Sequence, residues 1–331
     1  MSKKEHILVT GGAGFIGSHL TDELLQQGYA VTVIDNLANG KIENLEDAKK
    51  NTDFTFIQGD ILNYEDCKKA ILNVSYVFHL ACLGVRHSIH SPFENHRVNA
   101  EGTLNVLRAA KEEGIKRFIY ISTSEIYGRT TVFPITEDNL THPLTVYGAS
   151  KLAGEHYTNA FHECYNMETV VLRIFNNYGP RAHYEGDCGE IIPRSIINIL
   201  NGIRPIIFGD GSVTRDFFYV KDTAKVLSQM IHQEGIIGKT YNLGTGIEIT
   251  MKHLLEKIIE LTKSKITIEY LPDRPADVPR LWVNSSKIRS ILNISNEMNF
   301  DEGLQHTIDF YTTLNNTKDL VSEIKTLNWE K

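Results

Sequence analysis

The chain has 331 residues, of which 41% are hydrophobic and 23% are charged, a composition typical of a globular protein. Its net charge of −7 argues against general electrostatic binding to nucleic acid or to anionic membranes. No apolar run approaches the length of a membrane span or of a signal peptide, so we expect a cytoplasmic protein without a membrane partner. The four cysteines are scattered with no CxxC pair, which favours reduced thiols and predicts no metal site.

The first half of the chain alternates short apolar runs with segments of helical periodicity. Nearly continuous apolar strands alternating with helices are typical of a parallel sheet that is covered on both faces. We therefore predict an α/β fold with a Rossmann-like, doubly wound parallel sheet. The predicted strands are 6–10, 30–35, 54–60, 74–81, 117–123 and 168–175, and helical spacing marks 15–28 and 98–113.

The regular alternation loosens after residue 175, where Gly, Pro and Asn become common. We expect a smaller C-terminal substrate-binding lobe there, interleaved with returning pieces of the sheet domain. The predicted sheet domain comprises 1–175 and about 219–246, and the predicted lobe comprises 176–218 and 247–331. The polar segment 313–331 carries no clear structural signal.

A glycine-rich turn, "VTGGAGFIGSHL", follows the first predicted strand and opens a helix. Gly11, Gly14 and Gly17 permit a tight turn, close approach of a pyrophosphate and close packing of helix on strand. Asp35 ends the next strand, where a carboxylate can accept hydrogen bonds from ribose hydroxyls and would repel a 2′-phosphate. The pattern indicates NAD rather than NADP, and the alternative is a plain βα turn with a capping aspartate.

A tyrosine and a lysine stand four residues apart in "VYGASK". Tyr147 and Lys151 therefore project from one face of a predicted helix. A nearby ammonium stabilises tyrosinate, so we expect Lys151 to lower the pKa of Tyr147. Tyr147 could then exchange a proton with a substrate hydroxyl while hydride moves to or from the cofactor.

These motifs resemble the extended short-chain dehydrogenase/reductase family that remodels nucleotide sugars. The likeness covers nearly the whole chain and includes "GGAGFIG", "DN" at 35–36, "GDI" at 59–61, "HLA" at 79–81, "YGASK", "LRIFNNYGPR", "FGDGSVTRDFFYV" and "DRPADVPRLWVNSSK". The resemblance implies oxidation of the sugar at C4 by enzyme-held NAD, giving a 4-keto intermediate, followed by a second step that differs between members. It also implies a homodimer through the helices near 98–113 and 147–164.

The resemblance assigns roles to individual residues. Thr123 would hydrogen-bond the C4 oxygen, Tyr147 would be the base and Lys151 its partner. Cofactor-binding positions implied in this way are Gly11, Gly14, Phe15, Ile16, Gly17, Asp35, Asn36, Asp60, Ile61, Leu80, Ala81, Asn99, Ser122, Tyr147 and Lys151. Those implied for the nucleotide-diphosphate sugar are Arg86, Asn176, Arg215, Arg274 and Asp277.

The second step depends on Ser124 and Glu125. A 4,6-dehydratase needs a base at C5 and an acid for the departing C6 hydroxyl, so Glu125 favours a dehydratase or a uronate decarboxylase. The segment 84–92, with Arg86, instead resembles that of nucleotide-sugar 4-epimerases, in which Glu125 would be a structural carboxylate. A dinucleotide sensor without catalysis is a further alternative, although it would not need Thr123, Tyr147 and Lys151 together.

Overall fold

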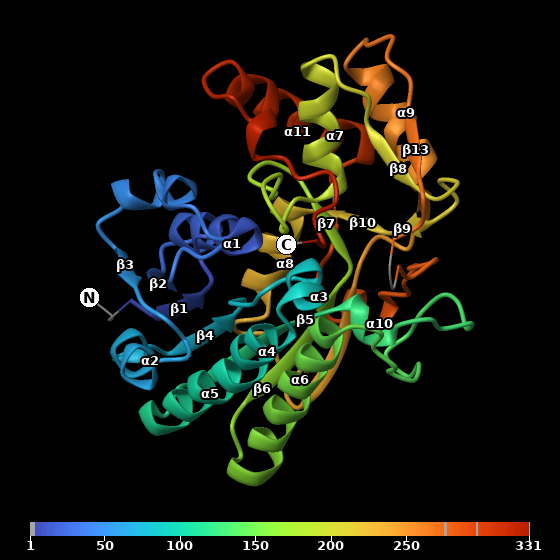
Figure 1. Ribbon diagram of the computed structural model, residues 1–331. Coiled ribbons are helices and arrows are strands. Elements are labelled where there is room, and N and C mark those ends of the chain that lie inside the picture. The colour runs from blue at the N-terminus through green and yellow to red at the C-terminus, as the bar shows by residue number, and fades with distance from the viewer. Residues whose placement is uncertain (1–3, 275–276, 296, 331) are drawn as a thin grey trace.

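The computed structural model describes residues 4–274, 277–295 and 297–330. A seven-stranded parallel sheet forms its centre, with the order β11-β6-β5-β4-β1-β2-β3 (Figure 1). This is the strand order of a doubly wound dinucleotide-binding sheet, so the predicted fold class is confirmed. The strands are β1 (His6–Thr10), β2 (Ala30–Asp35), β3 (Phe54–Gln58), β4 (Tyr76–His79), β5 (Arg117–Thr123), β6 (Thr169–Ile174) and β11 (Lys239–Leu243).

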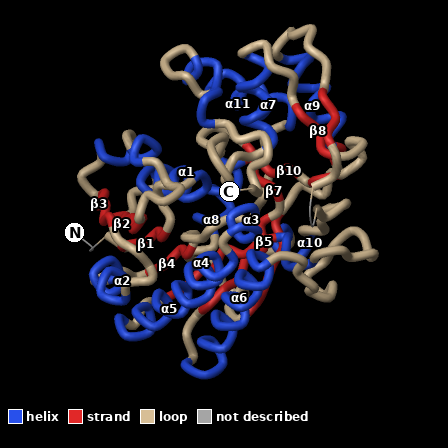
Figure 2. The backbone as a smooth tube through the Cα atoms, viewed as in Figure 1, coloured by secondary structure: helices blue, strands red, loops and turns tan. Residues whose placement is uncertain are grey.

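Helices cover both faces of this sheet (Figure 2). Alternate side chains of β1 point to opposite faces: Ile7 and Val9 join one hydrophobic core and Leu8 joins the other. The first core also contains residues of α1 and α8, and the second contains residues of α2 and α5, beside which α6 packs. These helices are α1 (Phe15–Gln26), α2 (Tyr64–Ile71), α5 (Gly102–Glu113), α6 (Val146–Tyr165) and α8 (Val220–Gln229).

The second lobe has its own core, built from three helices and short strand pairs. Its buried aliphatic and aromatic side chains, among them Ile196, Leu254 and Leu304, form one cluster. The lobe's elements are β7 (Asn176–Tyr178), α7 (Ile191–Leu200), β8 (Ile206–Phe208), β9 (Thr214–Arg215), β10 (Phe217–Tyr219), β12 (Ile249–Thr250), α9 (Met251–Leu261), β13 (Glu269–Leu271) and α11 (Phe300–Asn315). The strands pair as β7 with β10, β8 with β13, and β9 with β12.

Parts of the range assigned to the lobe pack with the sheet domain. Val278, Leu281 and Val283 cluster with Ile126 and Tyr127. The short helix α10 (Ser286–Arg289) lies in the range assigned to the lobe, yet Ile288 and Leu292 pack in the core beneath the sheet. The chain therefore returns to the sheet domain a second time, after its excursion through the lobe.

Several short elements carry the loops at the carboxyl ends of the strands. A π-helical turn, η3 (Arg97–Glu101), begins the predicted helix 98–113, and such turns are frequent at functional sites. The remaining short elements are η1 (Ile42–Leu45), η2 (Ala48–Lys50), α3 (Val85–His90), α4 (Pro92–His96), η4 (Ser124–Tyr127) and η5 (Val321–Glu323). Within the described residues, no helix is long and apolar enough to cross a membrane.

Candidate active site

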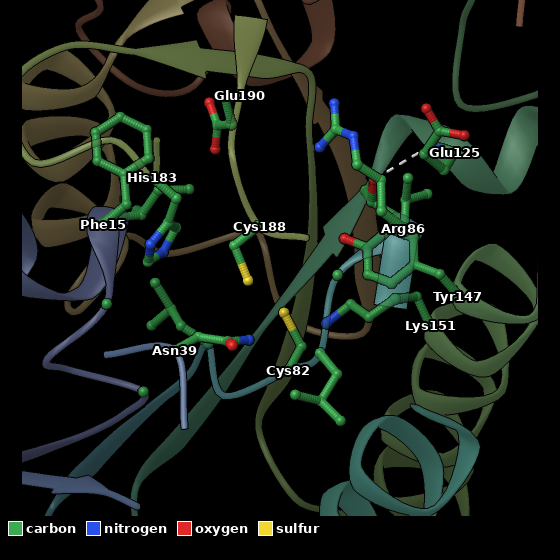
Figure 3. Close-up of a pocket in the computed structure, with 18 of the residues that line it drawn as sticks. Phe15, Asn39, Cys82, Arg86, Glu125, Tyr147, Lys151, His183, Cys188 and Glu190 are labelled. Atoms are coloured by element: carbon green, nitrogen blue, oxygen red, sulfur yellow. Dashed lines mark hydrogen bonds between the residues drawn. The ribbon is translucent and has the colours of Figure 1, made fainter. Parts of the chain in front are cut away.

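One large cavity, of about 520 Å³, lies at the carboxyl ends of the strands and extends into the lobe. Open α/β sheets bind ligands at this edge, where the strand order reverses. All of the site residues predicted from the sequence line this cavity except Asn99. In Figure 3, Glu125, Tyr147 and Lys151 enter from one side, and His183 lies on the other side.

The glycine-rich turn leaves no room for side chains. A Cβ on Gly11, whose φ is +69°, would lie 2.8 Å from the backbone of Ala81, and a Cβ on Gly17 would lie 2.3 Å from the carbonyl oxygen of Gly11. Gly14 caps α1 without any side-chain hydrogen bond, so the backbone N–H groups of the first turn face the cavity unobstructed by a side chain. This cradle fits the pyrophosphate of NAD.

Asp35 lies at the end of β2, as the sequence predicts. Its carboxylate accepts hydrogen bonds from the backbone N–H groups of Ala13 (3.0 Å) and Leu37 (2.8 Å), and burial raises its pKa. Asn36 donates to Asp60 at 3.2 Å, which ties the ends of β2 and β3 together. Both oxygens of Asp35 thus have one backbone donor each, and a carboxylate oxygen can accept another. Ribose binding by Asp35 stays a prediction.

Four predicted ligand-binding residues have buried polar atoms without a partner among the described residues; two are Arg86 and Arg274, described below, and the other two lie nearer the sheet. The latter atoms are the hydroxyl of Ser122, at the end of β5, and the side-chain oxygen of Asn176, in β7. Buried polar atoms in folded proteins are nearly always paired, with protein, water or ligand. Both residues line the cavity, so these atoms are suitable for ligand binding.

Asn99 is the exception among the predicted cofactor residues. It lies in the π-helical turn, 1% exposed, and does not line the cavity. Its side chain accepts from the Leu83 N–H at 2.8 Å and donates to the Leu83 carbonyl, to Asn95 and to Ser150. The side chain of Asn99 thus holds the backbone of Leu83 and, through Ser150, the start of α6, and its predicted role in cofactor binding stays a prediction.

The predicted catalytic residues come together where β5 ends and α6 begins. Thr123 is the last residue of β5, and its hydroxyl accepts the N–H of Glu125 at 3.2 Å, which starts the 3₁₀ turn η4. Thr145 caps α6 by accepting the N–H of Gly148 at 3.1 Å, which fixes the first turn that carries Tyr147.

Lys151 lies one turn further along α6 and is 2% exposed. Its ammonium donates to the carbonyl of Ile121 in β5 at 2.6 Å and lies 4.3 Å from the ring centroid of Tyr120. The ion pair between Arg173 and Glu155, 2.8 Å apart and buried, joins the same helix to β6. The helix that carries the catalytic pair is therefore held rigidly on the sheet.

The pKa values of the pair differ from the expectation. Burial raises the pKa of Tyr147 far above its usual value, opposed by its interaction with the Thr123 side chain, and burial lowers the pKa of Lys151. The predicted lowering of the Tyr147 pKa was wrong for the protein alone, because desolvation of the phenolate is the largest influence on it.

Glu125 follows Thr123 on the same turn and lines the same cavity. Burial raises the pKa of this carboxyl, and the positive charge of Arg215 is the largest opposing influence. A carboxyl with a raised pKa is a stronger base when ionised and a usable acid when protonated.

Arginines dominate the far end of the cavity. Arg215 donates to the carbonyl of Val278 and to Asp277, each at 2.8 Å, and Arg274 donates to the other oxygen of Asp277 at 3.1 Å. Asp277 therefore orients two arginines. The Nε atoms of Arg86 and Arg274 are buried without a partner in the described part of the chain. Such guanidinium groups suit a diphosphate.

Among the lining residues that the sequence reasoning missed, three bear most on function: Glu190, His183 and Trp329. Glu190 precedes α7 without capping it, and burial raises its pKa to about 7, opposed by the charges of His183 and Arg86. His183 itself lines the cofactor side. Trp329 reaches the cavity from the far end of the chain. A carboxylate just before an apolar helix is a weak signal for Glu190, and no local pattern marks the other two.

A doubly wound sheet, a glycine cradle and a Tyr–Lys pair on one helix define a class of NAD-dependent enzymes. Comparison with known proteins agrees: residues 8–307 match the family model described as GDP-mannose 4,6 dehydratase. The chain belongs to the family of NAD-dependent nucleotide-sugar epimerases, dehydratases and decarboxylases, within the extended short-chain dehydrogenases/reductases.

Individual relatives carry out all three reactions. The UDP-glucose 4-epimerase of Thermotoga maritima, solved with UDP-glucose, is 33% identical with a TM-score of 0.88, over 94% of this chain and 99% of that one. A dTDP-glucose 4,6-dehydratase from Streptomyces venezuelae, solved with NAD, is 28% identical with a TM-score of 0.90, over 96% and 99%. UDP-glucuronic acid decarboxylase 1 of Danio rerio is 32% identical over 93% of this chain and 73% of its own.

Proposed function

We propose that this protein is an NAD-dependent 4,6-dehydratase of a nucleotide-activated neutral hexose. The observation that carries the proposal is Glu125: a carboxyl of raised pKa stands two residues after Thr123 on one turn, in the cavity that also contains Tyr147. A dehydratase needs such a group next to the C4 site, and a 4-epimerase does not.

The first step is oxidation at C4. The nicotinamide of NAD, when bound, supplies an acceptor for the C4 hydride and later returns it to the sugar. Thr123 orients the C4 oxygen, and Tyr147 takes the hydroxyl proton as the carbonyl forms. Lys151, held on Ile121, keeps a positive charge beside the phenolate that results. The product of this step is the 4-keto sugar.

The second step is elimination of water across C5 and C6. The new ketone acidifies the C5 proton, and the Glu125 carboxylate removes it as the C5–C6 double bond forms. The C6–O bond breaks, and the protonated Glu125 gives that proton to the departing hydroxyl, which leaves as water. C6 would then take up the hydride that bound NAD returns, and C5 would take a proton from solvent while Tyr147 releases to solvent the proton it took from the C4 hydroxyl, so the net change is loss of one water. Ser124 has no acidic group, so one carboxyl serves as both base and acid.

The charges around Arg86 support a neutral sugar. Arg86 is a candidate partner for a substrate carboxylate or a phosphate, and its positive charge already acts on two carboxyls, Glu125 and Glu190. A uronate placed there would meet both acids close to a diphosphate that is itself negative. Like charges close together are unfavourable in a desolvated site. This argues against the decarboxylase alternative.

A 4-epimerase is the second candidate, because epimerases are slightly more numerous among the similar proteins. In that reaction the 4-keto sugar rotates in the site and receives hydride on the opposite face of C4. Glu125 would then have a structural role only.

Product analysis in D2O separates the two. The protein is incubated with UDP-, GDP-, dTDP- and CDP-hexoses, and products are examined by mass spectrometry and chromatography. Loss of water with deuterium at C5 supports the dehydratase. An isomer of unchanged mass without C5 deuterium would establish the epimerase instead, and loss of CO2 from a uronate would establish the decarboxylase.

Two matched variants assign the steps. Glu125→Gln should lower turnover by about 10²- to 10⁴-fold while reduced cofactor still accumulates, because only elimination is blocked. Tyr147→Phe should block the first step, so that neither reduced cofactor nor product forms. Full dehydratase turnover by Glu125→Gln would rule out the proposed base.

We also propose the homodimer implied by the family. The helices α5 and α6 lie side by side at one end of the molecule (Figure 1), where Leu104 and Tyr165 are 36% and 50% exposed. Light scattering should give about twice the 37.4 kDa of one chain, and a monomer at micromolar concentration would contradict the proposal.

A further inference from the structure

The last part of the chain folds back across the lobe as an ordered segment, which we call the C-terminal strap (residues 320–330). Leu320 is fully buried in the lobe core. Arg194 of α7 donates to the carbonyl oxygens of Lys325 (2.6 Å) and Thr326 (3.0 Å). In Figure 1 the strap runs from the end of α11 to the middle of the molecule, between the two lobes.

Two further hydrogen bonds tie the strap to the loop that precedes α7. Gly186 donates its N–H to the carbonyl of Glu323 at 3.0 Å, and the buried Asn328 donates to the carbonyl of Gly189 at 2.9 Å. This loop carries Cys188 and Glu190, both of which line the cavity. The strap is therefore fastened to one wall of the site.

Trp329 is the strap residue that lines the cavity itself. Its ring meets Phe208 of β8 edge to face, with centroids 4.9 Å apart and planes at 75°. The guanidinium of Arg274 lies 5.4 Å from the centroid of the same Phe208 ring. Two aromatic rings and an arginine thus stand together at the end of the cavity away from the glycine-rich turn.

This arrangement has one polar atom that is suited to a ligand. The Nε of Arg274, which lines the cavity, is buried without a partner among the residues that the structure describes. Arg274 and Trp329 both lie against the ring of Phe208. An aromatic face beside a guanidinium with an unpaired donor suits a nucleobase and its diphosphate, since every base has a face that can stack.

We propose that Trp329 is a binding residue for the nucleoside diphosphate part of the substrate, and that the strap closes that end of the cavity. The proposal rests on the proposed function, because it presumes a nucleotide-activated substrate. The strap lies beyond residues 8–307, which the family model matches, so this residue is an addition to the part of the chain that the family shares.

Tryptophan fluorescence tests this directly, because the chain has two tryptophans and the other one, Trp282, does not line the cavity. Trp282→Phe leaves Trp329 as the only indole. Titration with UDP, GDP, dTDP and CDP should change its emission saturably for at least one of them, with the dissociation constant that calorimetry gives. Trp329→Ala should weaken that binding about tenfold, as expected for loss of one stacked base.

Two variants control for disruption of the strap. Trp329→Phe keeps a ring and should bind within about threefold of wild type, and Leu327→Ala changes a partly exposed strap residue that does not line the cavity and should bind as wild type does. If wild type binds a nucleoside diphosphate and Trp329→Ala binds it equally well, the inference fails and the proposed function stands. If wild type binds none of the four, both fail.

Discussion

The two ends of the cavity, which we assign to the cofactor and to the substrate, would bind phosphate groups in opposite ways. At the cofactor end, backbone N–H groups at the start of α1 form the cradle, and glycines keep side chains out. At the substrate end, Arg215 and Arg274 supply charge through long side chains that Asp277 holds in place. Adding a Cβ to a glycine of the backbone cradle creates a steric clash, whereas replacing one arginine of a side-chain site removes a single contact and leaves the others in place. The two ends should therefore respond very differently to substitution.

The largest effect is expected at the cofactor end. Gly11→Ala should weaken NAD binding more than about 100-fold, because its Cβ would meet the Ala81 backbone at 2.8 Å. Gly28→Ala is the matched control, since Gly28 also has a positive φ, +88°, but nothing within 4 Å of its Cβ. Calorimetry with NAD and a melting curve for each variant make the measurement. If the two variants bind NAD equally well, steric contact of the Cβ with the Ala81 backbone does not determine NAD affinity, and the prediction is wrong.

The smaller effect is expected at the substrate end, from the Glu190 carboxyl. Burial holds its pKa at about 7 in the folded protein, above the value of 4.5 expected when unfolded. As pH rises, the Glu190 carboxyl loses its proton at a lower pH in the unfolded chain than in the folded protein. The free energy of unfolding therefore falls between about pH 4.5 and pH 7 and stays lower above that range. Glu190→Gln has no carboxyl to ionise, so its free energy of unfolding does not fall in this way. The substitution should raise the melting temperature at pH 8 by about 3 °C and change it little at pH 5.

The exposed Glu302 of α11 gives a control for that measurement, because Glu302→Gln removes a carboxyl that water solvates. If Glu190→Gln raises the melting temperature equally at pH 5 and pH 8, the claim that the buried Glu190 carboxyl titrates near pH 7 is wrong. Such a result would also weaken the argument that Arg86 is already occupied by two acids.

Local rules explain what the sequence could predict. The glycine turn, the aspartate that ends β2, and the Tyr–Lys spacing depend on residues close together along the chain, and the predicted strands agree with the observed ones to within two residues at each end. Strand 74–81 is shorter, Tyr76–His79, because Leu80 and Ala81 leave the sheet to cover Gly11. The sheet was predictable because each strand alternates with a helix of clear periodicity.

The remaining features depend on packing between distant segments. The hydrogen bonds of Asn99 to Leu83 and Ser150 join segments that are distant in the chain, so no local pattern predicts them. Trp329 lies 121 positions after Phe208, with which it pairs, and the polar sequence around it gives no periodic signal. The Tyr147 pKa was misjudged because burial is a property of the whole cavity.

The turn from Thr123 to Glu125 also bears on how this family diversified. It gathers the residue assigned to C4 and the residue assigned to C5 on three consecutive positions, fixed by one hydrogen bond of 3.2 Å. The oxidation machinery on α6 is anchored separately, through Lys151 to Ile121 and through Glu155 to Arg173. A change at position 124 or 125 can thus alter the outcome of the second step without disturbing the first. Divergence among epimerases, dehydratases and decarboxylases therefore needs few substitutions at positions 124 and 125, while the anchored helix α6 stays unchanged.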